Sequence, residues 1–309
     1  MLVDTLSNIR IWIVAGVILA LSIGSLGSLS SYLIIIVLMV QMTLSMEGLS
    51  FKPQDMKKDK TSILASVLFC FVVNTVITLG IGAMFINHYP DLWKGWVVLA
   101  AVPCAVSVIT AALYLNGNIK MSVLSSAVIY LLALVITPLI TLIFAGKATD
   151  PLRILLYVFL FVAVPMLMTI PMKKVQVNRH VKIITINAMM FLLVLLSLGY
   201  NRDYIFEDPT MVFLVTLGCI ARVFIVGFLL VLLMRRKGVK RSNGIVYISM
   251  AVWKNSGLAV TLCMILFIDS SLAVIPCIIS LLVELLWFAI MTGYEKKIWP
   301  TDNTGVCDG

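Results

Sequence analysis

Ten long apolar runs constrain this chain more than any other feature of its sequence. Each is close to the roughly 20 residues that an α-helix needs to cross the hydrocarbon core of a bilayer, whereas membrane barrel strands are shorter and alternate between apolar and polar residues. The sequence therefore predicts an all-α integral membrane protein with ten transmembrane helices. We place them at residues 10–28, 31–49, 61–87, 93–115, 119–145, 152–171, 182–200, 210–234, 245–267 and 271–293.

The composition agrees with this class of protein. Hydrophobic residues make up 61% of the 309 residues and charged residues only 12%, against about 25% charged residues in an average soluble domain. The six cysteines are scattered and only two histidines accompany them, so the spacing of a metal site cannot be assembled. We expect the thiols to pack as small apolar groups, and we expect neither a metal nor another cofactor.

The basic residues are distributed unevenly between the two sides of the predicted bundle. With the N-terminus inside, 17 of the 23 Lys and Arg residues fall on the inner side and four on the outer side. Because cytoplasmic loops are enriched in Lys and Arg, we expect both termini in the cytoplasm, in a membrane of the bacterial inner-membrane type. The net charge of +9 is then a topology signal and does not indicate a nucleic-acid partner.

Ten helices divide into two halves of five, which must have opposite orientations in the membrane. This is the arrangement of inverted-repeat transporters, whose sites lie near the midplane where helices are broken. We expect residues 1–145 and 146–300 to form the first and second repeats of one transmembrane domain, followed by a disordered tail at 301–309. The fourth and ninth helices correspond, and both contain helix breakers, namely Pro103 in one and the Asn-Ser-Gly run at 255–257 in the other.

Two cations, Arg222 and Lys254, lie well inside predicted helices, away from the helix ends. An ionisable residue within a span is costly and is therefore a candidate functional residue. Lys254 stands in the run YISMAVWKNSGLAVT at 247–261, beside the proposed break of the ninth helix. Its structural alternatives are an ion pair with Glu284 or extension of the side chain to the membrane interface. For Arg222 we expect a buried, structural ion pair with Glu284.

Four short motifs spread over nearly the whole chain carry a family resemblance. They are SMEGLSF at 45–51, the Pro103 segment followed by Gly117 and Asn118, TPL at 137–139, and KNSGLA at 254–259. With these motifs the chain resembles the bile acid:sodium symporters and their bacterial homologues. The resemblance implies a four-helix panel and a six-helix core, with unwound fourth and ninth helices that cross at the centre. It also implies transport of organic anions by alternating access.

The chain departs from that family at both sodium sites. The carboxylate and amide ligands of the family pattern are missing here, and the two hydroxyls that remain are too few for a hard cation, which needs several oxygen ligands. The matching positions in this sequence are Val108, Ile109, Ser122, Ser126 and Met250 for one site, and Cys70 and Lys254 for the other.

We therefore expect Lys254 to act as a built-in cation in place of sodium. A lysine that loads and releases a proton would couple transport to protons, whereas one that stays protonated would give sodium-independent uniport or exchange.

These observations predict a secondary transporter of a small organic anion, embedded in the lipid bilayer. Bile acids, steroid sulfates, pantoate-like acids and small carboxylates all satisfy the charge requirement. The residues expected to contact the anion are Asn255, Ser256, Pro103, Ser107, Thr110 and Asn74.

Two alternatives come from other functional classes. A metalloid permease of the arsenite type would rely on a cysteine near the start of the fourth helix, and Cys104 has that position. A membrane enzyme or sensor is the second alternative. Against it, the spans offer no carboxylate pair, no histidine cluster and no nucleophile with an adjacent base. We therefore expect that the chain is not an enzyme.

Overall fold

The computed structural model describes residues 6–25, 27, 29–47, 59–146, 150–172, 178–268 and 270–299, and over these residues it contains helices and no strand. Among these described residues, seven helices are long and apolar enough to cross a membrane, and two shorter apolar helices, Ile9–Ile23 and Tyr32–Met46, accompany them. The chain is therefore an all-α integral membrane protein. The seven are Lys60–Phe85, Ile119–Ala145, Leu152–Met172, His180–Tyr200, Pro209–Arg236, Arg241–Leu266 and Leu272–Met291.

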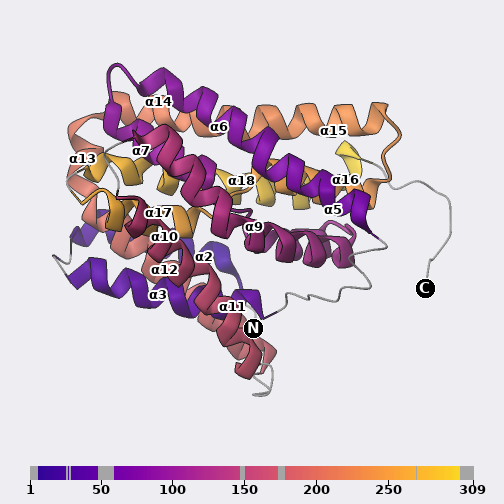
Figure 1. Ribbon diagram of the computed structural model, residues 1–309, viewed down its shortest axis with the longest axis horizontal. Coiled ribbons are helices and arrows are strands. Elements are labelled where there is room, and N and C mark those ends of the chain that lie inside the picture. Colours follow the sequence, from indigo (N-terminus) through magenta and orange to yellow (C-terminus); the bar gives the residue numbers. More distant parts are fainter. Residues whose placement is uncertain are drawn as a thin grey trace.

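One group of helices packs together on the lower side of the view in Figure 1. Helix α12 lies against both α2 and α3, and α11 packs on α3. We call these helices, with α10, the panel. Its members are α2 (Ile9–Ile23), α3 (Leu29–Met46), α10 (Pro151–Val158), α11 (Val164–Met172) and α12 (Arg179–Tyr200).

The remaining spans form a second group, which we call the core. Helices α14 and α15 run along its upper edge in Figure 1, and α6 lies beside them. The core contains α5 (Lys60–Leu68), α6 (Thr75–Gly82), α7 (Pro90–Ala101), α8 (Ser107–Tyr114), α9 (Ile119–Ala145), α14 (Pro209–Ile220), α15 (Val226–Arg236), α16 (Arg241–Val252), α17 (Ser256–Leu266) and α18 (Ile275–Ile298). Short segments connect or extend these helices: η2 (Ala83–Phe85), α13 (Arg202–Glu207) and η6 (Ser271–Val274).

In the part of the chain that the structure describes, three spans contain a π-helical segment near their middle. These are η1 (Phe69–Asn74) between α5 and α6, η4 (Phe159–Ala163) between α10 and α11, and η5 (Ala221–Ile225) between α14 and α15. In a π-helix each backbone hydrogen bond spans one residue more than in an α-helix, which interrupts the regular pairing of N–H and carbonyl groups. Such segments are frequent at functional sites. Two of these segments, η1 and η5, adjoin the centre of the core.

Both predicted helix interruptions are present. The fourth span is split into α7 and α8 by residues 102–106, and the ninth into α16 and α17 by residues 253–255. Proline has no N–H to continue a helix, which accounts for the break at Pro103. In the ninth span Asn255 is the N-cap residue of α17, because its Oδ1 accepts from the backbone N–H of Leu258 at 3.1 Å.

Several boundaries differ from the predicted ones. The span predicted at 10–28 ends at Ile23, where Gly24 takes a positive φ of 79°, a conformation that suits glycine. The ninth span breaks before Ser256, so Ser256 and Gly257 begin a helix and do not interrupt one. Residues 48–51 of the SMEGLSF motif and the tail at 301–309 lie outside the described residues.

Candidate functional site

The Lys254 side chain lies at the centre of the core and is fully buried, with 0% of it exposed. Its Nζ donates to three backbone carbonyl oxygens, those of Cys70 at 3.0 Å, Ala100 at 2.8 Å and Val102 at 3.0 Å. The hydroxyl oxygen of Thr75 lies 3.3 Å away. We call these four oxygens the Lys254 cage. The side chain therefore reaches neither lipid nor water.

Helix irregularities supply the oxygens of the Lys254 cage. Cys70 belongs to the π-helical segment η1, while Ala100 and Val102 stand where α7 ends. The last carbonyls of a helix have no partner within it and carry partial negative charge, so a cation is favourable there. The ring of Phe71, 5.3 Å from Nζ, adds a cation–π contact.

The groups around Nζ are hydrogen-bond acceptors. A lysine ammonium has three N–H donors and no acceptor, which suits four surrounding oxygens. The one hydroxyl in the cage, that of Thr75, donates its own hydrogen to the Ala100 carbonyl at 2.9 Å. A neutral amine would carry a lone pair that no group of the cage could bond. The cage therefore matches the charged form of Lys254.

The other carbonyls at the break of the fourth span are bonded as well. Thr137 donates to Ala101 at 2.9 Å, and Tyr130 donates to Cys104 at 2.9 Å. The backbone N–H of Asn255 donates to Pro103 at 2.8 Å. With the Lys254 cage, all five consecutive carbonyls from 100 to 104 accept a hydrogen bond, and the two broken helices are joined directly.

Arg222 and Glu284 form hydrogen bonds to groups on both sides of the break in the ninth span. They form the predicted buried ion pair, with 1% and 7% of the two side chains exposed. Arg222 also donates to the Val252 carbonyl at the end of α16, at 3.1 Å. Glu284 accepts from the backbone N–H of Lys254 at 3.3 Å and from the Ser256 hydroxyl at 3.2 Å. Glu284 thus meets the backbone of Lys254, while its ion-pair partner is Arg222.

The panel reaches this crossing through α3. The side-chain amide of Asn255 donates to the Tyr130 hydroxyl at 2.9 Å and to the Met42 sulfur at 3.2 Å. Next to Met42, Gln41 is 7% exposed and its Oε1 has no hydrogen-bond partner. A Cβ placed on Gly257 would be 3.8 Å from that oxygen. A panel amide therefore lies beside the first turn of α17.

The structure separates the residues predicted to contact substrate into two groups. Pro103, Asn255 and Ser256 meet at the crossing and are buried, whereas Ser107 and Thr110 lie on an exposed face of α8. The remaining one, Asn74, is also buried, where its side-chain oxygen accepts from Thr78 at 2.9 Å and from Arg222 at 3.3 Å.

The residues at the positions of the family's sodium ligands are packed among, or bonded to, groups of this protein. Ser122 is buried and donates to the Ile119 carbonyl of its own helix at 2.8 Å. Ser126 is buried near the thiol of Cys104, which itself adjoins the thiol of Cys70. Met250 and Val108 are buried, and Ile109 is partly buried. Among the described residues, no cluster of three or more His, Cys, Asp or Glu could hold a metal ion.

Sequence reasoning missed several groups that complete the crossing. Tyr130 and Thr137 bond carbonyls of the broken fourth span, and Ser280 bonds both Arg222 and Glu284. Each is a hydroxyl within an apolar span, a weak signal because such groups commonly bond between membrane helices. Thr137 at least belongs to the TPL motif.

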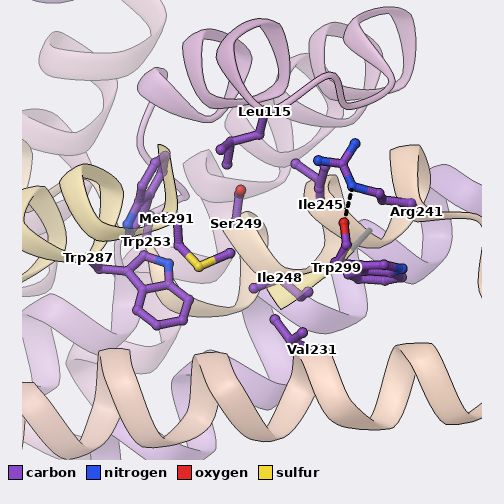
Figure 2. A pocket seen from close by; sticks show the side chains of 10 residues that line it. All are labelled: Leu115, Val231, Arg241, Ile245, Ile248, Ser249, Trp253, Trp287, Met291 and Trp299. Carbon is purple, nitrogen blue, oxygen red and sulfur yellow. Dashed lines mark hydrogen bonds between the residues drawn. The ribbon is translucent and has the colours of Figure 1, made fainter. Parts of the chain in front are cut away.

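A separate small cavity lies between α8, α15, α16 and α18, next to the break of the ninth span (Figure 2). Its volume is about 20 Å³, enough for about one water molecule. Trp253 and Trp287 stand on one side of it, and Arg241 stands on the other, where its Nε donates to the Trp299 carbonyl at 3.1 Å. The complete lining is Leu115, Val231, Arg241, Ile245, Ile248, Ser249, Trp253, Trp287, Met291 and Trp299.

Comparison with known proteins places this arrangement in a family. Residues 8–296 match the model of the SBF-like CPA transporter family, which is a family of transporters and not of enzymes. No curated protein matches the sequence. The match covers nearly the whole chain and confirms the resemblance to bile acid:sodium symporters that the motifs indicated. The chain belongs to the SBF-like CPA transporter family.

Proposed function

We propose that this transporter carries an organic anion by alternating access without sodium, and that the Lys254 ammonium stands in for the sodium ions. The Lys254 cage is the observation that supports this proposal. Hard metal cations bind oxygen ligands, and here three carbonyls and a hydroxyl surround a cation that belongs to the protein. A covalently attached charge fills an oxygen cage of the kind that would hold a metal ion.

The charge balance at the crossing favours an anionic substrate. Arg222 and Glu284 offset each other, so a protonated Lys254 leaves one positive charge. The N-terminus of α17, beside Asn255 and Ser256, adds the positive end of a helix dipole. An anionic headgroup such as a carboxylate or sulfate is therefore the substrate chemistry that this centre would attract.

The arrangement of irregular helices supports the remaining parts of the proposal. In two inverted repeats of five spans, η1 corresponds to η5, and the break after α7 corresponds to the break after α16. The bias of basic residues supports cytoplasmic termini in a bacterial inner membrane. On that orientation α8 lies in the cytoplasmic half, where its exposed Ser107 and Thr110 offer hydroxyls to a substrate.

Uptake into proteoliposomes tests the role of Lys254. In sodium-free buffer we expect the native protein to accumulate an organic anion, drawn from a panel of labelled carboxylates and steroid sulfates, and added sodium should not change the rate. Lys254→Gln should lower sodium-free uptake roughly 30-fold or more. Removing one partner of a buried charge interaction costs about 2–5 kcal/mol, and 1.4 kcal/mol is about tenfold.

The assay needs a control for general damage to the bundle. Lys94→Gln removes a partly exposed lysine that pairs with Asp91 at the end of a span and should leave uptake within about twofold of native, because such pairs contribute at most about 1 kcal/mol. Native uptake stimulated by sodium, or full activity of Lys254→Gln without sodium, would contradict the proposal.

A metalloid permease is the second candidate, because the buried thiols of Cys70 and Cys104 are neighbours and thiolates are soft ligands. We expect Cys104→Ser to retain organic-anion uptake within about threefold, since a hydroxyl of similar size replaces a thiol that acts by packing. Arsenite flux and anion uptake should be measured on the same vesicles. Arsenite flux in the native protein that disappears in Cys104→Ser would favour the metalloid function instead.

A further inference from the structure

Arg222 lies in a second oxygen cage within the core. It belongs to the π-helical segment η5 and is 1% exposed. Its Nη1 donates to the side-chain oxygen of Asn74 at 3.3 Å and to the Val252 carbonyl at 3.1 Å, and its Nη2 donates to the Ser280 hydroxyl and to Glu284. We call these four oxygens the Arg222 cage.

The Arg222 cage and the Lys254 cage correspond in the two halves of the chain. Lys254 bonds carbonyls where α7 ends, and Arg222 bonds the carbonyl where α16 ends. One π-helical segment takes part in each case, since η1 supplies the Cys70 carbonyl and η5 supplies Arg222 itself. Each broken helix thus has a protein cation at the negative end of its first half.

The contacts of Arg222 differ from those of a simple ion pair. Arginine commonly grips a carboxylate through two parallel hydrogen bonds. Here Glu284 offers one oxygen to Arg222 and turns the other toward Ser256. The Nε of Arg222 is buried without a partner. The oxygens therefore gather around the two terminal nitrogens, which share one carbon atom, in one small region of the core.

We propose that Arg222 is a second built-in cation, and that the Arg222 cage is a latent site for a monovalent metal ion such as sodium or potassium. Without the guanidinium, a carboxylate, an amide oxygen, a hydroxyl and a backbone carbonyl would line the space that its two terminal nitrogens now fill, and these are oxygen ligands of a hard cation. The inference extends the proposed function, in which one protein cation replaces bound ions, to both breaks.

Ion-dependent stability of Arg222→Gln tests this site. The variant should be purified in choline chloride and melted in choline, sodium and potassium chloride, with labelled sodium binding measured in parallel. We expect a lower melting temperature than native in choline, a saturable rise of about 5 °C with sodium or potassium at concentrations far above Kd, and one bound ion per chain. The native protein should melt at one temperature in all three salts and bind no ion.

Two matched variants test whether the ion-dependent stability arises in the Arg222 cage. Arg222→Lys keeps a cation in the cage and should show no ion dependence. Arg222→Gln combined with Glu284→Gln removes the carboxylate and should lose the ion response. If Arg222→Gln folds only when sodium or potassium is present throughout purification, that outcome also supports the site.

Several results would overturn the inference. They are equal melting of Arg222→Gln in all salts, a response that survives loss of Glu284, or failure to fold in every salt. Because Lys254 is intact in each variant and the readout is ion binding and not uptake, such a failure is distinguishable from failure of the proposed function.

Discussion

Lys254→Gln should become a sodium-dependent transporter. The substitution removes the ammonium but leaves the oxygens of Cys70, Ala100, Val102 and Thr75 in place, and the new amide adds one more oxygen. Buried carbonyls that lose their donor each cost about 1–3 kcal/mol, so a cation that restores their partner should bind. We expect uptake that is lost roughly 30-fold or more without sodium to recover severalfold or more with sodium.

Lys254→Met is the matched control for this rescue. Methionine has nearly the length of lysine but supplies neither charge nor a strong acceptor, and it fills the space that an ion would need. Uptake should therefore stay low in both sodium and choline. Rates should be measured over a sodium titration in proteoliposomes with the potential clamped. Equal rescue of both variants, or of neither, would mean that the cage is not an ion site.

Glu284→Gln should have the largest effect on stability. The substitution leaves the Arg222 guanidinium buried without a carboxylate, and breaking such a buried pair costs about 3–5 kcal/mol. The backbone N–H of Lys254 and the Ser256 hydroxyl also lose a charged acceptor. Thermal unfolding in a fixed detergent, followed by the loss of helical signal, would measure the change.

A second glutamate provides the control for Glu284. Glu47 pairs with Lys182 at 2.6 Å, but 20% and 24% of the two side chains are exposed, and exposed pairs contribute about 1 kcal/mol or less. Glu47→Gln should therefore unfold close to the native temperature. A loss of stability for Glu284→Gln no larger than for Glu47→Gln would show that Arg222 does not depend on its partner.

Charge in an apolar setting made part of the site predictable. Lys254, Arg222 and Glu284 were recognisable because each is costly within a span, and the pairing of Arg222 with Glu284 followed from opposite charge. The breaks were recognisable from Pro103 and from the Asn-Ser-Gly run after Lys254. The seven long apolar helices of the described residues agree with seven predicted spans within a few residues, whereas Gly24 ends α2 early and the complete ten-helix inverted repeat stays a prediction.

The partners of these charges were not predictable, for a physical reason. Most oxygens of the Lys254 cage are backbone carbonyls, and every residue has one, so Ala100 and Val102 carry no signal in their side chains. Apart from Asn74 and Arg222, the π-helical segments η1 and η5 have ordinary apolar composition. Their extra residue changes which carbonyls are free, and that depends on packing against the broken helices and not on local propensity.

The row of bonded carbonyls from 100 to 104 bears on the alternating-access movement proposed above, because it indicates which contacts such a movement could break. Parting α16 and α17 from α7 would strand the carbonyls of Val102 and Pro103, whose donors are Lys254 and Asn255. The panel, in contrast, touches Asn255 through the Met42 thioether, a weak acceptor that exchanges partners cheaply. A movement of the core relative to the panel along that contact would carry the Lys254 charge through part of the transmembrane electric field. A full crossing of one charge is worth about 2.3 kcal/mol per 100 mV. A monovalent anion bound nearby would cancel that charge. Membrane voltage would therefore change the energy of the movement when the carrier is empty, but not when the anion is bound.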